Sequence, residues 1–130
     1  MSTTVSRTPI WTARVLRGFA ISFLLFDAGL KVLQASVAVE GTASLGYPPS
    51  SVFGIGVVEL VCLALYIVPR TSFLGAVLLT GYLGGAIATH VRVGHPLFTH
   101  ILFPTYVAAF IWGALYLRDA RLRALAPLRA

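Results

Sequence analysis

Three side chains inside long apolar segments could take part in chemistry, because they carry charge where charge is costly. Asp27 and Lys31 lie near the end of the first apolar segment, and Glu59 lies inside the second. An ionisable group within hydrocarbon costs about 2.5–3.5 kcal/mol on insertion scales, so it marks an interior face, a partner or a site. Asp27 and Lys31 are four residues apart, which lets them meet on one helix face.

The two carboxylates are predicted to lie at one depth. Asp27 precedes the end of its segment by six residues, and Glu59 follows the start of the next by seven. At 1.5 Å per residue both lie roughly 9–10 Å from the same end of a bundle. We expect a polar pocket in the outer half of the bundle, open to the extracytoplasmic side. The candidate catalytic residues are Asp27, Lys31, Glu59 and His90, and the candidate ligand-binding residues are Tyr82, Thr89, Arg92, His100 and Tyr106.

The charged residues also have purely structural interpretations. Lys31 can extend to the outer interface, and its pairing with Asp27 can serve only to neutralise both charges for insertion. Glu59 has no partner on its own helix, so a protonated Glu59 can act as a hydrogen-bond donor between helices. The types and spacing of these residues leave both interpretations open.

The histidines do not form a zinc motif. His90, His95 and His100 are spaced by five, so neighbours point about 140° apart on a helix, unlike the four-residue pair of a zinc-binding helix. His95 lies between Gly94 and Pro96 and is predicted to be a turn residue. We predict no metal site.

The elements that must position these groups follow from composition. The chain has 130 residues, of which 58% are hydrophobic and 11% are charged, and its mean hydropathy is +0.88. Soluble domains carry about 25% charged residues, and a bilayer-spanning helix takes about 20 apolar residues. These values predict an all-α membrane protein, a single domain over 1–130 in which four transmembrane helices form an antiparallel bundle. The predicted spans are 14–33, 52–68, 73–90 and 100–117, followed by a basic tail over 118–130.

The basic residues predict the orientation. Eight of the ten fall at the face that would hold both termini, and only Lys31 and Arg92 fall near the other. The positive-inside rule therefore places both termini in the cytoplasm and the loops 34–51 and 91–99 outside. Nucleic acid is not an expected partner, because the basic residues form short flanks without interleaved aromatic residues. The eight are Arg7, Arg14, Arg17, Arg70, Arg118, Arg121, Arg123 and Arg129.

The cysteine content limits the possible redox chemistry, and the glycine content bears on helix packing. Cys62 is the only cysteine, which excludes an intramolecular disulfide and a CxxC redox pair. The third span is rich in small residues, Gly81, Gly84, Gly85 and Ala88, which are expected to let a neighbouring helix approach. The Gly81-x-x-x-Gly85 spacing suits either packing within the chain or a homo-oligomer.

Several segments resemble the DoxX-like family of small bacterial four-helix membrane proteins. They are FLLFDAGLKVL, LGYPPSSVFGIGVVELVCLALYIVPRT, LGAVLLTGYLGGAIATHVRVG and IWGALYLRDARLRAL, and the resemblance runs from Arg14 to Leu125. It implies a bacterial inner-membrane location and a membrane redox role, since relatives resemble a subunit of a thiosulfate:quinone oxidoreductase and others assemble with thiol-metabolism and superoxide-handling proteins. The chain has no flavin, haem or iron–sulfur motif. The electron carrier would then be a bound quinone or the cofactor of a partner protein.

Three functions remain open at this point. The leading one is a pocket for a small lipophile such as a quinone, in a protein that is part of a membrane redox system. The second is a stand-alone enzyme that uses Asp27 as base and Glu59 as acid for isomerisation, cyclisation or epoxide opening on a hydrophobic substrate. The third is a non-catalytic scaffold subunit in which the polar groups only fix helix register.

Overall fold

The computed structural model describes residues 7–125, and within that range the chain is all helical without a strand. The prediction of an all-α chain is confirmed. The long helices are α1 (Arg7–Val32), α3 (Val52–Ile67), α4 (Ser72–Arg92) and α5 (Phe103–Arg118). The shorter ones are α2 (Ser36–Ser44) and α6 (Ala120–Leu125), with the helical turns η1 (Pro49–Ser51), η2 (Pro69–Thr71) and η3 (Leu97–Ile101). Arg129 and the end of the predicted basic tail lie outside the described residues, as does the side chain of Arg7.

Two long helices end in the same hydrogen-bonded motif. After α1, Gln34 has a φ of 54° and the amide of Ala35 donates to Leu30 O at 2.9 Å. After α4, Gly94 has a φ of 73° and the amide of His95 donates to His90 O at 3.1 Å. This six-to-one bond across a left-handed residue satisfies carbonyls that the end of a helix leaves unpaired. The motif fixes where each chain segment turns.

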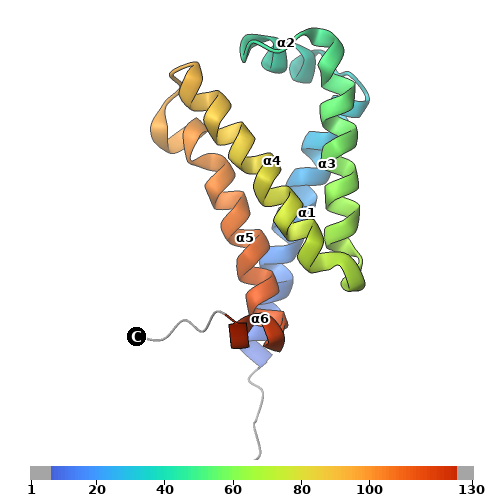
Figure 1. Ribbon diagram of the computed structural model, residues 1–130, viewed down its shortest axis with the longest axis vertical. Coiled ribbons are helices and arrows are strands. Elements are labelled where there is room, and N and C mark those ends of the chain that lie inside the picture. The colour runs from blue at the N-terminus through green and yellow to red at the C-terminus, as the bar shows by residue number, and fades with distance from the viewer. Residues whose placement is uncertain (1–6, 126–130) are drawn as a thin grey trace, which may run out of the picture.

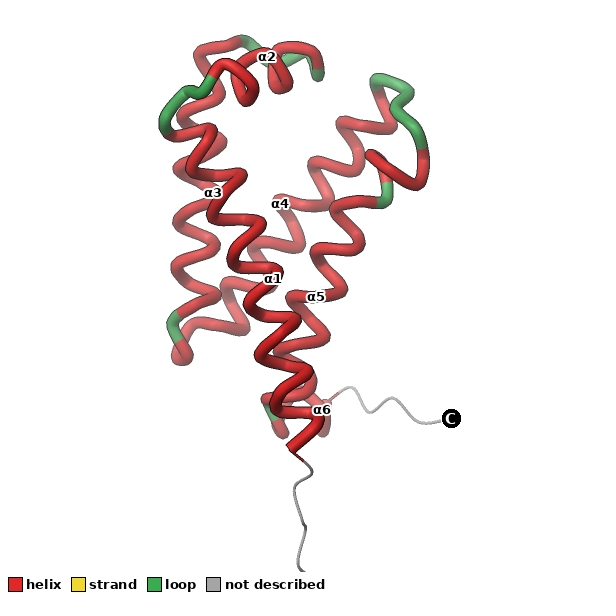
Figure 2. Tube along the Cα trace, turned by 180° about the vertical axis from the view of Figure 1, so that it is seen from behind, coloured by secondary structure: helices red, strands yellow, loops and turns green. Residues whose placement is uncertain are grey.

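The four long helices alternate in direction along the chain and form two diverging pairs. α1 packs against α3 and α5, and α4 packs against the same two helices. Both ends of the described chain lie at one end of the molecule (Figure 1). Toward the other end, α1 and α3 separate from α4 and α5, in the front view and from behind (Figures 1 and 2). The buried core therefore lies where the helices converge; it includes Ala20, Leu24, Leu63, Tyr66, Leu79, Ile111 and Leu115.

Within residues 7–125, three helical segments are long and apolar enough to cross a membrane, which makes the chain a multi-pass membrane protein. They are Pro49–Ile67, Pro69–Arg92 and Leu97–Arg118, and they contain most of the second, third and fourth predicted spans. The first predicted span lies in α1, which is not among the three. Large apolar side chains such as Phe19, Phe26 and Phe53 are exposed on the outside of the helices. A surface of this kind is stable in contact with lipid.

Both predicted outer loops contain more helix than expected. The connection 34–51 forms α2 and η1, because its prolines, Pro48 and Pro49, lie only at its end and leave Ser36–Ser44 free to wind. In the second connection α4 continues to Arg92, and η3 begins at Leu97. Both connections are therefore helical over part of their length.

Close helix approach occurs at different glycines from those expected. A Cβ at Gly81, Gly84 or Gly85 would meet no atom within 4 Å, so these residues do not serve helix packing within the chain. At Gly75, by contrast, a Cβ would overlap the backbone of Tyr66 on α3. The reason is that Gly75 lies in the first turn of α4, beside the tight connection from α3, whereas the later glycines lie where the helices have diverged.

Substitution of Gly75 by alanine is expected to lower the stability of the protein. The added Cβ meets backbone, which cannot rotate away, and overpacking of this kind costs about 1–3 kcal/mol. Gly81→Ala is the matched control on the same helix, and it should be neutral or stabilising by up to about 1 kcal/mol because alanine is the better helix former. The midpoint of thermal unfolding in detergent measures both. Equal midpoints for the two variants would contradict the close approach at Gly75.

Candidate functional site

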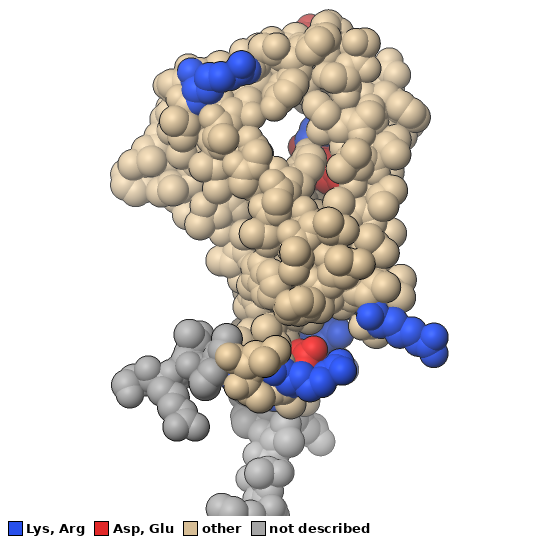
Figure 3. All heavy atoms as spheres, viewed as in Figure 1, with Lys and Arg blue, Asp and Glu red and all other residues tan. Residues whose placement is uncertain are grey.

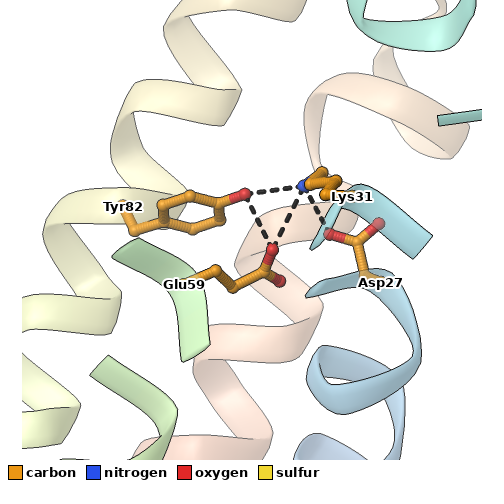
Figure 4. Close-up of polar contacts among 4 residues, drawn as sticks. All are labelled: Asp27, Lys31, Glu59 and Tyr82. Carbon is orange, nitrogen blue, oxygen red and sulfur yellow. Dashed lines mark hydrogen bonds and ion pairs between the residues drawn. The ribbon is translucent and has the colours of Figure 1, made fainter. Parts of the chain in front are cut away.

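A cluster of four polar residues, here named the Lys31 cluster, joins α1, α3 and α4 (Figure 4). It consists of Asp27, Lys31, Glu59 and Tyr82. Lys31 Nζ donates to Asp27 Oδ2 at 2.5 Å, to Tyr82 Oη at 2.7 Å and to Glu59 Oε2 at 3.2 Å. Tyr82 Oη in turn donates to Glu59 Oε2 at 3.0 Å. The ammonium of Lys31 thus has a partner for each of its three hydrogens.

The local packing that brings these groups together depends on Gly56. A Cβ at this position would lie 2.7 Å from Lys31 Cβ and 3.0 Å from the backbone nitrogen of Val32. Its absence lets α3 lie directly against the end of α1. Glu59 follows three residues later on the same helix face, so the contact at Gly56 delivers its carboxylate to Lys31.

The burial of the cluster is uneven. The side chain of Glu59 is 0% exposed, that of Lys31 is 16% exposed and that of Asp27 is 36% exposed. Glu59 Oε1 is buried and makes no hydrogen bond with any described residue. Two ionised carboxylates around one ammonium carry a net negative charge, and a buried charge is costly unless it is compensated. A single transferable proton in the cluster removes that imbalance.

The cluster lies beside a cavity of about 980 Å³ between the diverging helix pairs. Figure 3 shows an opening on the face formed by α3 and α4, with Lys and Asp or Glu atoms at its wall. Asp27, Lys31 and Tyr82 reach this cavity, whereas Glu59 lies behind them. Most of its remaining wall is apolar, including Phe23, Leu30, Ile55, Val58, Leu83, Phe103 and Val107. The expected polar pocket is thus an apolar cavity with polar groups at its edges.

Residues 36–47, which comprise α2 and the turn after it, are here named the α2 segment. This segment covers the end of the cavity that was predicted to be open to the outside. Its residues form part of the cavity wall, and it lies over the space between α3 and α4 (Figure 1). Arg92 donates to Leu45 O at 2.7 Å, and the hydroxyls of Tyr47 and Thr89 lie 2.9 Å apart. Gly46 between them has a φ of 93°, and a Cβ there would lie 2.9 Å from the Arg92 guanidinium. The opening visible in Figure 3 is on the side of the bundle instead.

A second polar group at the cavity wall consists of His90, His95 and His100. Their ring centroids are 4.8–5.8 Å apart, and the Nδ1 atoms of His90 and His95 are 2.7 Å apart. A hydrogen bond between two imidazole nitrogens needs a hydrogen on one and none on the other. The 140° spacing on a continuous helix does not apply to these residues, because α4 ends at Arg92 and the chain then turns back. The turn brings His95 and His100 next to His90. Among the residues that the structure describes, no three His, Cys, Asp or Glu side chains are arranged to hold a metal ion.

The remaining predicted site residues are Thr89, Arg92 and Tyr106, and they lie at three different places in the structure. Thr89 lines the cavity and donates to Gly85 O at 2.8 Å, so its hydroxyl accepts from Tyr47. Arg92 holds the α2 segment rather than lining the cavity. Tyr106 is 42% exposed, also lies away from the cavity wall, and donates to Phe98 O at 3.1 Å. The structure therefore brings most of the predicted residues to the cavity wall, but not Glu59, Arg92 or Tyr106.

Comparison with known proteins identifies the family. The model of the DoxX-like family matches residues 15–114, which is most of the chain and includes every predicted site residue. The chain belongs to the DoxX-like family. The resemblance inferred from the sequence motifs is confirmed over these residues, and the last segment quoted for it extends beyond the match. Comparison with curated proteins and with solved structures found no match.

Proposed function

We propose that this DoxX-like protein binds a small lipophile such as a quinone in the cavity, as part of a membrane redox system. The observation that carries the proposal is a largely apolar cavity of about 980 Å³ with hydrogen-bonding groups at one end of its wall. Ligand sites are typically apolar concavities with a few convergent polar groups. A scaffold subunit has no need of such a space, so the cavity favours a ligand.

The residues of the Lys31 cluster fit a quinone head group. Carbonyl oxygens of a quinone accept hydrogen bonds, and the Lys31 ammonium and the Tyr82 hydroxyl lie at the cavity wall. Each donates within the cluster, and each would exchange one such bond for a bond to the head group. A bound quinone supplies two-electron, two-proton redox chemistry, with the electrons coming from the redox cofactor of a partner in the membrane or in thiol metabolism. Lys31 would orient the head group. Glu59, whose Oε1 is buried and makes no hydrogen bond within residues 7–125, would hold the proton of the cluster. The apolar wall excludes water from these groups.

The proposed arrangement in the membrane is a single-domain, antiparallel bundle of four spans, with α1 as the first. The buried residues Ala13, Ala20, Leu24 and Ala28 form one stripe on α1, while Phe19 and Phe26 are exposed. A helix that is buried along one stripe and apolar on its outer face is stable at the edge of a bundle in lipid. We place both termini on the cytoplasmic side of the bacterial inner membrane, as the basic residues favour.

Quinone binding by the full chain in nanodiscs tests this function. Tyr82→Phe removes a donor at the cavity wall and is expected to weaken binding by about three- to tenfold, the value of one neutral hydrogen bond. Tyr106→Phe is the matched control, since its hydroxyl bonds Phe98 away from the cavity, and it should bind like the wild type. In cells, Glu59→Gln should alter membrane sensitivity to oxidants. Absence of quinone binding together with unchanged oxidant sensitivity in Glu59→Gln would overturn the proposal.

A second candidate function is acid–base catalysis on a hydrophobic substrate. It is favoured by the different surroundings of the two carboxyls. Asp27 pairs with Lys31 and is partly exposed, whereas Glu59 is fully buried and its Oε1 has no hydrogen-bond partner among the described residues. Asp27 would be the base and Glu59 the acid in an isomerisation, a cyclisation or an epoxide opening. Turnover of lipophilic epoxides or polyenes that is lost in both Asp27→Asn and Glu59→Gln supports this function. Turnover that survives both substitutions excludes it.

A further inference from the structure

A second pocket lies at the opposite end of the molecule from the α2 segment. It measures about 350 Å³ and lies between the turn that connects α3 to α4 and the junction of α5 with α6. Basic side chains gather at this end of the molecule (Figure 3). The arginines that line the pocket are Arg70, Arg118 and Arg121.

The positive charge in this pocket is not neutralised by its one acidic residue. Asp119 Oδ1 accepts the amides of Arg121 at 2.9 Å and Leu122 at 3.4 Å, so it caps α6. Its only ion pair among the described residues is with Arg121, at 3.7 Å, and that side chain is 92% exposed. Arg70 and Arg118 make no hydrogen bond or ion pair with any residue that the structure describes. Two guanidinium groups are therefore available to a ligand.

A buried hydroxyl without a partner lines the same pocket. Ser72 is 4% exposed, and its Oγ makes no hydrogen bond with a described residue. A buried polar group that lacks a partner in a native structure requires an explanation, and a ligand is one. Ser72 is also the first residue of α4, and Thr71 before it donates its hydroxyl to Leu65 O instead of capping the helix. The amino end of α4, which favours anions, thus lies at the pocket without a side-chain cap.

We propose that this pocket binds a phosphate group. Arg70 and Arg118 would supply charge-assisted hydrogen bonds, Ser72 a neutral one and α4 the positive end of its dipole. Arginine forks suit phosphate oxygens because they donate two parallel bonds. The chemistry is the same whether the phosphate belongs to a lipid head group or to a soluble anion. The site lies apart from the Lys31 cluster and is independent of the function proposed for it.

Two probes distinguish these sources in the full-length protein. Native mass spectrometry from detergent counts the phosphatidylglycerol molecules that the protein retains, and equilibrium dialysis measures binding of radiolabelled inorganic phosphate. Retention of lipid alone identifies a head-group site, whereas binding of inorganic phosphate identifies a site for soluble anions. Either result supports the proposal, provided that the pocket variants reduce it.

Arg118→Gln is expected to weaken binding of whichever probe binds, lipid or inorganic phosphate, by about tenfold or more. Ser72→Ala changes no charge and is expected to weaken the same binding by about three- to tenfold. Arg14→Gln is the control of equal charge change, since Arg14 lies on α1 against Trp11 and does not line the pocket. It should bind like the wild type. Ser72→Ala keeps the test valid if Arg118→Gln does not fold. The proposal is overturned if neither probe binds, or if binding by the folded pocket variants equals that of Arg14→Gln.

Discussion

Lys31→Met is expected to be the most destabilising single substitution in the polar part of this protein. It removes the ammonium that contacts Asp27, Glu59 and Tyr82, and it leaves a fully buried carboxyl beside a second one without the cation that holds them together. Removing one partner of a buried ion pair costs about 3–5 kcal/mol. The lower part of that range applies here, because Asp27 is 36% exposed and keeps some solvation. The thermal unfolding midpoint of the detergent-solubilised protein measures the loss.

A charge-matched series separates the loss of the cation from the loss of side-chain packing. Adding Glu59→Gln to Lys31→Met replaces the buried carboxyl by an amide, which stays neutral without a cation or a proton, and should restore a large part of the stability. Adding Asp27→Asn should restore less, because Asp27 is the more exposed carboxylate. The three proteins form part of a double-mutant cycle, which isolates the pairwise interaction. Equal midpoints for Lys31→Met and the wild type would show that the ion pair contributes nothing to stability.

Gly85→Leu is expected to weaken ligand binding in the cavity strongly while the fold is retained. Gly85 lines the cavity, and a Cβ there meets no atom within 4 Å, so a leucine side chain can occupy space that a ligand needs. The helix itself gains from replacement of glycine, by about 0.5–1 kcal/mol. Quinone affinity should fall by about tenfold or more, since a displaced ligand loses its apolar contacts.

Gly84→Leu provides a close control for this experiment. Gly84 is the preceding residue of α4, also has open space at its Cβ position, and does not line the cavity. The same chemical change there should leave affinity unaltered. If the two leucine variants bind the ligand equally, the cavity is not the binding site. A scaffold function would then account better for the Lys31 cluster.

The clustering of Asp27, Lys31 and Glu59 could be predicted from the sequence, but the residues that surround the cluster could not. The four-residue spacing of Asp27 and Lys31 and the equal depth of Glu59 were sufficient to predict one cluster, because helix rise and periodicity are fixed by the backbone. Tyr82 was predicted as a ligand-binding residue, but its hydrogen bonds to Lys31 and Glu59 depend on how α4 packs against α3. His90 and His100 were predicted at the pocket, whereas His95 was predicted only as a turn residue. The spacing does not show that His95 joins the other two, because the three belong to a helix end, a turn and η3, which share no helical wheel.

The positions of close helix packing also could not be predicted from the amino-acid composition. The glycine-rich stretch of α4 was expected to pack closely against a neighbour, yet Gly81 and Gly85 line the cavity. Gly56 and Gly75, which the sequence does not distinguish, are the positions of close approach. A glycine permits contact but does not require it, so the divergence of the helix pairs decides which glycines are in contact.

By itself, the sequence determined that this chain is helical, lies in a membrane, and belongs to the DoxX-like family, because hydropathy, charge and motif spacing are local properties of the chain. Only the tertiary structure decided that two helix pairs diverge around a cavity and that α2 covers it. It also decided that Ser72, whose hydroxyl has no partner in the part of the chain that the structure describes, lines a pocket with Arg70 and Arg118. These features depend on crossing positions between helices far apart in the chain. Such positions follow from the packing of all the side chains together, which no single segment specifies.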